Sequence, residues 1–251
     1  MPSRVLYYTC KKSKGTEKMF DKNLFLIDTE TAGSIGFPRP YDVSYIIGNP
    51  QTKEILCSRA FVVREIWEDE ELMASAYYAS KRELYKRDIE NGKRKVFPWA
   101  VICKIIREDM AKYNCSTIGA YNMNFDHRAM DNDAKYITRG KYRFAFPKET
   151  DFICVWRMAC TSILRSKWFF KWADANNAFT ACGNLSTSAE TAYRFITKQT
   201  DFSEEHMGIE DALIEWEILL KILRSRMLYE TEPNSACWRI PTKAYKEARG
   251  V

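Results

Sequence analysis

Two acidic residues follow a short apolar segment near the start of the chain, in the order Asp28-Thr29-Glu30. Residues 24–28 are almost entirely apolar, which is typical of a strand that is covered on both faces. Because side chains alternate between the faces of a strand, Asp28 and Glu30 point in the same direction. Two carboxylates buried side by side repel each other and require cations to neutralise them. Carboxylate oxygens favour Mg²⁺ or Mn²⁺, so the pair predicts a divalent metal site.

Two further carboxylates stand near the beginning of expected helices. Asp126 follows a short strand over residues 117–121, and Asn124 is expected to cap the helix that carries it. Taken alone, Asp126 is explained better by a favourable interaction with the helix dipole. Asp211 lies in the first turns of an amphipathic helix over residues 209–223, at the edge of its apolar face. That face is expected to consist of Ala212, Leu213, Trp216, Leu219, Leu220 and Leu223.

The chain has only two histidines, and each lies close to one of these carboxylates. His206 precedes Asp211 by five residues, in the loop that leads into the same helix. A lone histidine is more often structural, but this one lies within reach of the same cleft. His127 adjoins Asp126, and neighbouring residues on a helix point about 100° apart. We therefore expect His127 to face away from a site at Asp126.

The acidic residues and the histidine form an ordered pattern that resembles the DEDDh branch of the 3′→5′ exonucleases. The pattern consists of Asp28-x-Glu30 with Thr31-Ala32-Gly33, then Asn122-x-x-Phe125-Asp126, then His206-x4-Asp211. The resemblance covers most of the chain, from about residue 22 to about residue 224. The sister branch has a tyrosine four residues before the last aspartate, where this chain has Met207. Residues 64–97 and 184–205 are similar in character to phage-type members of the branch.

The resemblance implies a ribonuclease H-like α/β fold, with a mixed sheet of five strands flanked by helices. It also implies a catalytic site in which four carboxylates hold two divalent ions, Mg²⁺ or Mn²⁺. His206 would then act as the general base, for which an imidazole pKa of about 6.5 is suitable. The implied metal ligands are Asp28, Glu30, Asp126 and Asp211.

Three other residues of the pattern are expected on the substrate side of the site. The resemblance implies that the backbone around Thr31 contacts the terminal nucleotide. Asn122 and Phe125 are expected to neighbour the substrate, although packing explains Phe125 equally well.

The implied activity is the release of nucleoside 5′-monophosphates from the 3′ end of DNA, preferably single-stranded. An exoribonuclease acting on RNA or short oligoribonucleotides is an alternative. The carboxylates do not distinguish DNA from RNA, because a sugar 2′-hydroxyl is read by other residues, which the pattern does not identify. A non-catalytic nucleic-acid-binding module of the same fold is another, because a fold does not guarantee its chemistry. The presence of all five catalytic residue types argues against that module. Association with a polymerase and formation of a homodimer are both left open.

The composition agrees with a globular protein that binds a polyanion. The 251 residues carry a net charge of +6, and setting aside four site carboxylates raises the remainder to +10. The eight cysteines form no CxxC pair, so a zinc site is not expected. Cys103 and Cys154 are expected to behave as small apolar residues in a reducing compartment. With no apolar stretch near about 18 residues and no apparent signal peptide, we expect a cytoplasmic protein without a membrane span, in the host cytoplasm if phage-encoded.

The elements that must position the site alternate in type. Strands over residues 42–48 and 55–63, separated by a turn, are expected to pair antiparallel. Residues 64–97 are expected to form one or two inserted surface helices, and Pro98 to open the next helix. The exonuclease domain is expected over residues 1–227, beginning with a basic segment at residues 11–18, followed by a basic tail over residues 228–251.

The second half is expected to be mainly helical. Asp151 is expected to cap a helix, and Thr187 with Glu190 to form a capping box for another. Residues 167–172 alternate aromatic rings with lysines, which is typical of a single-strand binding surface but is explained more simply by a helix end and turn. Basic runs at residues 91–95 and 139–143 are expected to be solvated loops.

Overall fold

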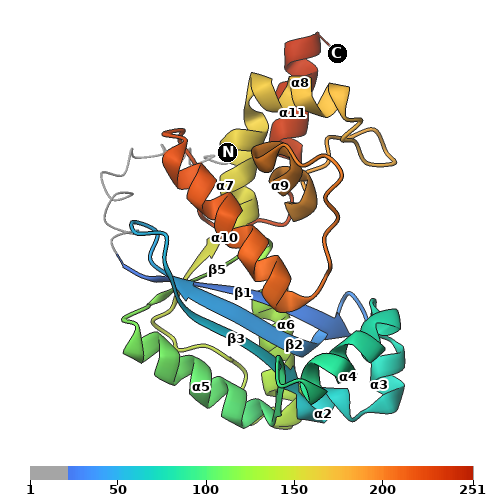
Figure 1. Ribbon diagram of the computed structural model, residues 1–251, viewed down its shortest axis with the longest axis vertical. Helices are drawn as coiled ribbons and strands as arrows, with labels where there is room; N and C mark the ends of the chain where they lie inside the picture. The colour runs from blue at the N-terminus through green and yellow to red at the C-terminus, as the bar shows by residue number, and fades with distance from the viewer. Residues whose placement is uncertain (1–21, 251) are drawn as a thin grey trace, which may run out of the picture.

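A mixed sheet forms the centre of the molecule in the computed structural model, which describes residues 22–250 (Figure 1). Within this range the sheet has six strands in the order β4-β3-β2-β1-β5-β6. The pairs β1–β2 and β2–β3 are antiparallel, and the other three pairs are parallel. The strands are β1 (Leu24–Ala32), β2 (Arg39–Gly48), β3 (Ile55–Val63), β4 (Lys95–Phe97), β5 (Thr117–Ala120) and β6 (Asp151–Cys154).

The expectation of five strands was wrong, because both edges of the sheet carry a short strand that the sequence pattern did not reveal. β4 lies at the end of the segment expected to be helical, and it pairs with β3. β6 begins at Asp151, which was expected to cap a helix; that helix instead starts after Cys154. Strands of three and four residues are too short to show a period of two, and their pairing with β3 and β5 decides their conformation.

Helices cover both faces of the sheet (Figure 1). Leu24 and Leu26 of β1 belong to a core shared with α7 to α10, whereas Phe25 and Ile27 belong to the core shared with α5. β1 therefore alternates between two buried faces, as its apolar sequence predicts. The helices are α2 (Arg64–Trp67), α3 (Glu70–Ala74), η1 (Ala79–Lys81), α4 (Arg82–Glu90), α5 (Trp99–Lys112), α6 (Met123–Ile137), α7 (Val155–Thr161), η2 (Ile163–Arg165), α8 (Lys167–Ala175), α9 (Ala189–Thr197), α10 (Gly208–Arg224) and α11 (Arg239–Arg249).

Three expected helix details are corrected by the structure. α6 begins at Met123 after Asn122, so Asn124 lies inside the helix and does not cap it. Ser188, not Thr187, caps α9, and its hydroxyl accepts the amide of Thr191 at 3.1 Å. In α10 the expected apolar residue Leu213 is exposed, while Ile214, Ile218 and Ile222 are buried. The buried face of α10 is therefore rotated from the predicted one toward the isoleucines.

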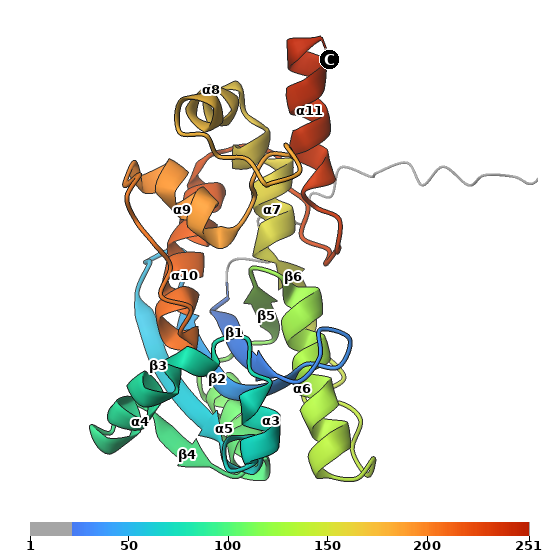
Figure 2. The same cartoon turned by 90° about the vertical axis from the view of Figure 1, so that its right-hand side faces the viewer.

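The segment over residues 64–97 lies at one end of the sheet, where α2, α3 and α4 lie together (Figure 1), and Figure 2 shows α3 and α4 from the side. Its basic run was expected to be solvated, but the Arg94 guanidinium is fully buried. Arg94 donates to Asp42 on β2 and, at 2.9 Å, to Glu210 on α10. The buried Arg94 side chain therefore links the insertion to β2 and to α10 through charged hydrogen bonds.

The C-terminal segment docks on the helical layer. Tyr245 of α11 packs edge-on against Phe170 of α8, and its hydroxyl donates to Asp174 at 2.5 Å. The basic segment at residues 11–18 lies outside the described residues.

Cys103 and Cys154 are buried, as expected of small apolar side chains. Among residues 22–250, no helix combines the length and the apolar character that crossing a membrane requires.

Candidate active site

Three of the predicted metal ligands converge where β1 meets the start of α10. Asp28, Glu30 and Asp211 each offer one carboxylate oxygen, and these oxygens lie within 4.8 Å of one another. Asp28 and Glu30 share the face of β1 that carries Leu24 and Leu26 and that packs against the α10 side. The alternation of a strand therefore brings the first two carboxylates together, and α10 adds the third.

Asp126 lies beside this cluster, at the start of α6. β5 pairs with β1 only as far as Leu26, and the chain then turns into α6, which carries Asp126 in its first turn. One Asp126 oxygen accepts the backbone amide of Thr29 at 3.1 Å and the Thr29 hydroxyl at 2.9 Å. These bonds hold Asp126 against β1, close enough for its charge to raise the pKa of Asp28.

Gly208 allows the start of α10 to approach the sheet. A Cβ atom at this position would lie 2.9 Å from the Ser44 Cβ and 3.1 Å from Asp42. Only glycine permits this approach without displacing β2, and Asp211 stands three residues further along the same turn. The glycine of the His206-Met207-Gly208 segment therefore positions the last carboxylate.

A fifth carboxylate, Glu215, lies at the cluster and was missed by the sequence analysis. It follows Asp211 by one turn of α10 and is 3% exposed. Its charge is the largest electrostatic contribution, after burial, to the raised pKa of Asp28. The signal that could have found it is an acidic residue four positions after Asp211, among the apolar residues of α10.

Burial is the largest cause of a raised pKa at each predicted metal ligand. It raises the pKa of Asp28 well above its usual range, that of Glu30 to about 9, Asp126 to about 7 and Asp211 to about 8. Like charges raise the pKa of Asp28, Glu30 and Asp211 further, while the ammonium of Lys81 lowers that of Glu30 and Asp211. The carboxylates therefore need positive charge to ionise together at neutral pH.

The donor set fits hard divalent cations. Oδ2 of Asp28, Oδ1 of Asp211 and Oε2 of Glu215 are buried and accept no hydrogen bond from any described residue. Buried carboxylate oxygens are normally satisfied, and unpaired ones are costly. Oxygens that converge in this way are the ligands that Mg²⁺ and Mn²⁺ prefer.

His206 lies in the loop before α10, beside the insertion. Its imidazole stacks on the Tyr78 ring, with centroids 4.6 Å apart and an angle of 13° between the planes. Nδ1 lies 3.8 Å from a carboxylate oxygen of Glu204. Burial and the charge of Lys81 lower the pKa of His206, so the ring is mostly neutral at pH 7.

The other histidine has a different environment. The ring of His127 stacks on Phe152 at 4.3 Å, and its Nε2 lies 3.7 Å from Asp131. Asp126, by contrast, contacts Thr29. His127 therefore faces away from the carboxylate cluster, as helical geometry predicts.

The three residues expected on the substrate side lie close in the chain to site carboxylates, on β1 and at the start of α6. Thr31 is half-buried, immediately after the irregularity in β1 between Glu30 and Thr31. Asn122 is exposed at the start of α6. Phe125 is half-buried, with the guanidinium of Arg128 over its ring at 5.7 Å. Their roles toward a substrate stay predictions.

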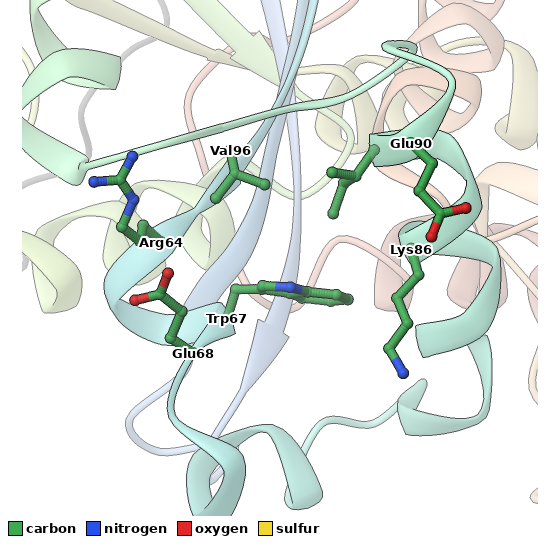
Figure 3. Close-up of a pocket in the computed structure, with 7 residues that line it drawn as sticks. Arg64, Trp67, Glu68, Lys86, Glu90 and Val96 are labelled. Carbon is green, nitrogen blue, oxygen red and sulfur yellow. The ribbon is translucent and has the colours of Figure 1, made fainter.

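A pocket of about 760 Å³ lies elsewhere, on the outer side of the insertion (Figure 3). Trp67 of α2 extends into it, and Lys86 and Glu90 of α4 stand on the opposite wall. None of the predicted site residues lines it. The convergent carboxylates are therefore the better candidate for chemistry.

The fold is similar to that of known 3′-exonucleases. A full-length 3′-exonuclease matches with a TM-score of 0.53 and 14% identity, over 86% of this chain and 88% of that chain. A 3′-exonuclease in 3′-end-specific recognition of a histone mRNA stem-loop matches with a TM-score of 0.50 and 13% identity, over 86% and 91%. Escherichia coli exonuclease I in complex with a dA16 oligonucleotide has a TM-score of 0.49 and 13% identity, over 82% and 41%.

No protein-family profile matches the sequence, and no curated protein is significantly similar to it. The structural matches show that the chain shares its fold with known 3′-exonucleases over most of its length, as the resemblance predicts. The similarity to phage-type exonucleases stays a prediction.

Proposed function

We propose that the protein is a metal-dependent 3′→5′ exonuclease that releases nucleoside 5′-monophosphates from DNA, preferably single-stranded. The observation that carries this proposal is the convergence of Asp28, Glu30 and Asp211, with Asp126 held alongside by Thr29. The 3′-exonuclease fold supports it. The chain has all four carboxylates of the pattern and its histidine, which are the residue types that such hydrolysis needs.

Asp28, Glu30, Asp126 and Asp211 would hold two divalent ions, Mg²⁺ or Mn²⁺. When bound, such ions neutralise the carboxylates, polarise the phosphate and make water more acidic. The buried oxygens of Asp28 and Asp211, unpaired among the described residues, support this assignment.

His206 is proposed as the general base. Its lowered pKa leaves the imidazole neutral at pH 7 and able to take a proton from the attacking water. The water oxygen forms a bond to phosphorus while the bond from phosphorus to the 3′ oxygen breaks. The 3′ oxygen takes up a proton from solvent and His206 returns its proton to solvent, so the shortened strand ends in a new 3′-hydroxyl and the terminal nucleotide leaves as a 5′-monophosphate.

A basic and aromatic surface on α6 and its neighbouring loops supports a single-stranded nucleic acid as substrate. Arg128 donates to the Ile35 carbonyl at 3.3 Å, and Arg39 lies over the Tyr136 ring at 4.2 Å, so the loop after β1 lies against α6. Exposed rings with cations suit stacked bases and phosphates. The exposed apolar residues here are Ile35, Phe37, Tyr136, Tyr142 and Phe144, and the exposed cations are Arg128, Lys135, Arg139, Lys141 and Arg143.

An exoribonuclease is a second candidate function. One of the similar structures recognises the 3′ end of a histone mRNA stem-loop. The carboxylates act on the phosphodiester, which DNA and RNA share, and do not read the sugar.

The purified full chain should be compared on single-stranded DNA, duplex DNA and RNA of one sequence, with Mn²⁺ and with excess chelator. We expect shortening from the 3′ end of single-stranded DNA, abolished by the chelator and reduced by about a hundredfold or more in Asp126→Asn. Faster degradation of RNA would favour the second candidate. Binding of all three polymers without turnover under any metal condition would refute the enzyme and favour a binding module.

A further inference from the structure

The insertion between β3 and α5 brings an aromatic ring and a cation to the loop before α10 that carries His206. Tyr78 and Lys81 lie in and beside η1, more than 120 residues before His206 in the sequence. The Tyr78 ring stacks on the His206 imidazole at 4.6 Å. The Lys81 ammonium lies 4.7 Å from the centre of the same Tyr78 ring and donates to the His206 carbonyl at 3.3 Å. One short segment therefore contacts both the side chain and the backbone of His206.

The backbone of His206 requires such support. Its φ angle is +50°, in the left-handed region that residues other than glycine seldom adopt. A residue remains in this region when the surrounding structure holds it there. The bond from Lys81 to the His206 carbonyl and the stacked Tyr78 ring are contacts that do so.

The Tyr78 hydroxyl also lies within range of the site carboxylates' charges. The charges of Glu30 and Asp211, together with Glu204, raise the pKa of its hydroxyl, after burial as the main cause. Tyr78 therefore contacts His206 and is also near enough to Glu30 and Asp211 for their charges to act on its hydroxyl. Its neighbour Tyr77 is 83% exposed and packs edge-on against Tyr78.

We propose that Tyr78 is a positioning residue which, with Lys81, holds the His206 imidazole in place for proton transfer. This proposal rests on the proposed function of His206 as general base. It gives the insertion a role in the chemistry, since the base is fixed by contacts that the insertion provides. A general base accelerates a reaction only when its nitrogen is held within hydrogen-bond reach of the proton it takes.

The variants Tyr78→Ala and Tyr78→Phe separate positioning from folding. Phenylalanine keeps the stacked ring without the hydroxyl, and Tyr77→Ala removes an exposed ring from the same segment as a matched control. We expect kcat to fall about tenfold or more in Tyr78→Ala with KM changed less than about threefold, and both values to stay within about twofold in the other two variants. A loss in KM alone would show that Tyr78 contacts substrate, and would overturn the proposal.

NMR of the histidine rings gives a readout that does not depend on activity. The chain has two histidines, so His127, stacked on Phe152, is an internal reference. In metal-free protein, Tyr78→Ala should remove the ring-current shift from the His206 protons and leave those of His127 in place, while Tyr78→Phe should keep both.

Unchanged His206 signals in Tyr78→Ala would overturn the proposal even if the enzyme were active. The charged groups that face His206, namely Glu204, Glu190 and Lys81, are retained in each variant, so a change reflects the ring. If the wild-type chain hydrolysed no nucleic acid, the proposed function would fail while the NMR result still decided the contact.

Discussion

Raising the pH of metal-free protein should destabilise it, because the buried carboxyls of the site hold protons that the unfolded chain releases. Asp126 illustrates the magnitude. Burial raises its pKa from the ordinary 3.8 to about 7, so between these values the folded state binds the extra proton and stability falls as the pH rises. The difference corresponds to about 4 kcal/mol for this one carboxyl at about 1.4 kcal/mol per pH unit. Since the pKa of Glu30 is about 9 and that of Asp211 about 8, the decline continues to about pH 9.

Such a loss is a large fraction of the free energy of unfolding of a typical domain, which is roughly 5–15 kcal/mol. Urea unfolding of the full chain in excess chelator, from pH 5 to pH 9, should show about 3 kcal/mol of the Asp126 loss, because this range includes about two pH units below its pKa. Mn²⁺ should restore stability strongly at pH 8 and weakly at pH 5, because at pH 5 protons already neutralise the carboxyls. Asp126→Asn, which mimics the protonated form, should show a smaller decline. A metal-free stability that stayed constant or rose between pH 5 and pH 9 would refute the account of these carboxyls.

Other substitutions test separate parts of the structure. Arg94→Met removes a buried cation that donates hydrogen bonds to Asp42 and Glu210. Urea unfolding should therefore show that the free energy of unfolding falls by about 3–5 kcal/mol. A fall below about 1 kcal/mol would contradict the stabilising role of these bonds. Glu215→Gln should raise the Mn²⁺ concentration needed for half-maximal thermal stabilisation by about tenfold, whereas an unchanged midpoint would place Glu215 outside the metal site. Phe144→Ala should weaken binding of a single-stranded oligonucleotide in chelator by about fivefold or more. Trp168→Ala removes an exposed ring on α8 and should not weaken this binding. Equal effects of the two substitutions on oligonucleotide binding would exclude the surface on α6 and its neighbouring loops as the binding face.

The strands that carry the site could be predicted from the sequence because the pattern there is local. Residues 24–28 have the uninterrupted apolar character of a central strand, and the alternation of side chains places Asp28 and Glu30 on one face. The turn between β2 and β3 likewise identified their antiparallel pairing. In each case a few neighbouring residues determine both the conformation and the direction of the side chains.

The short edge strands could not be predicted, because their conformation depends on partners distant in sequence. β4 pairs with β3, and β6 pairs with β5, each through three or four residues. The buried Arg94 was misassigned for a related reason. A basic run is normally solvated, and only the folded chain brings Asp42 and Glu210 to the guanidinium.

Within the site, the residues that support the pattern were harder to find than the pattern itself. Glu215 was overlooked although it shares the helical face of Asp211, because the apolar residues around it dominated the periodicity. Tyr78 and Lys81 carry no sequence signal for a contact with His206, since they lie in a charged insertion far from it. Such contacts follow only from the tertiary structure.

The most direct test of the central claim follows one 5′-labelled single-stranded oligonucleotide at single-nucleotide resolution, with the released products identified by mass spectrometry. With Mn²⁺ present, the full chain should give a ladder that shortens from the 3′ end and nucleoside 5′-monophosphates as products, while His206→Ala prepared in parallel should slow the ladder by about a hundredfold or more. Internal cleavage, nucleoside 3′-phosphates, or equal rates for wild type and His206→Ala would contradict the proposed mechanism.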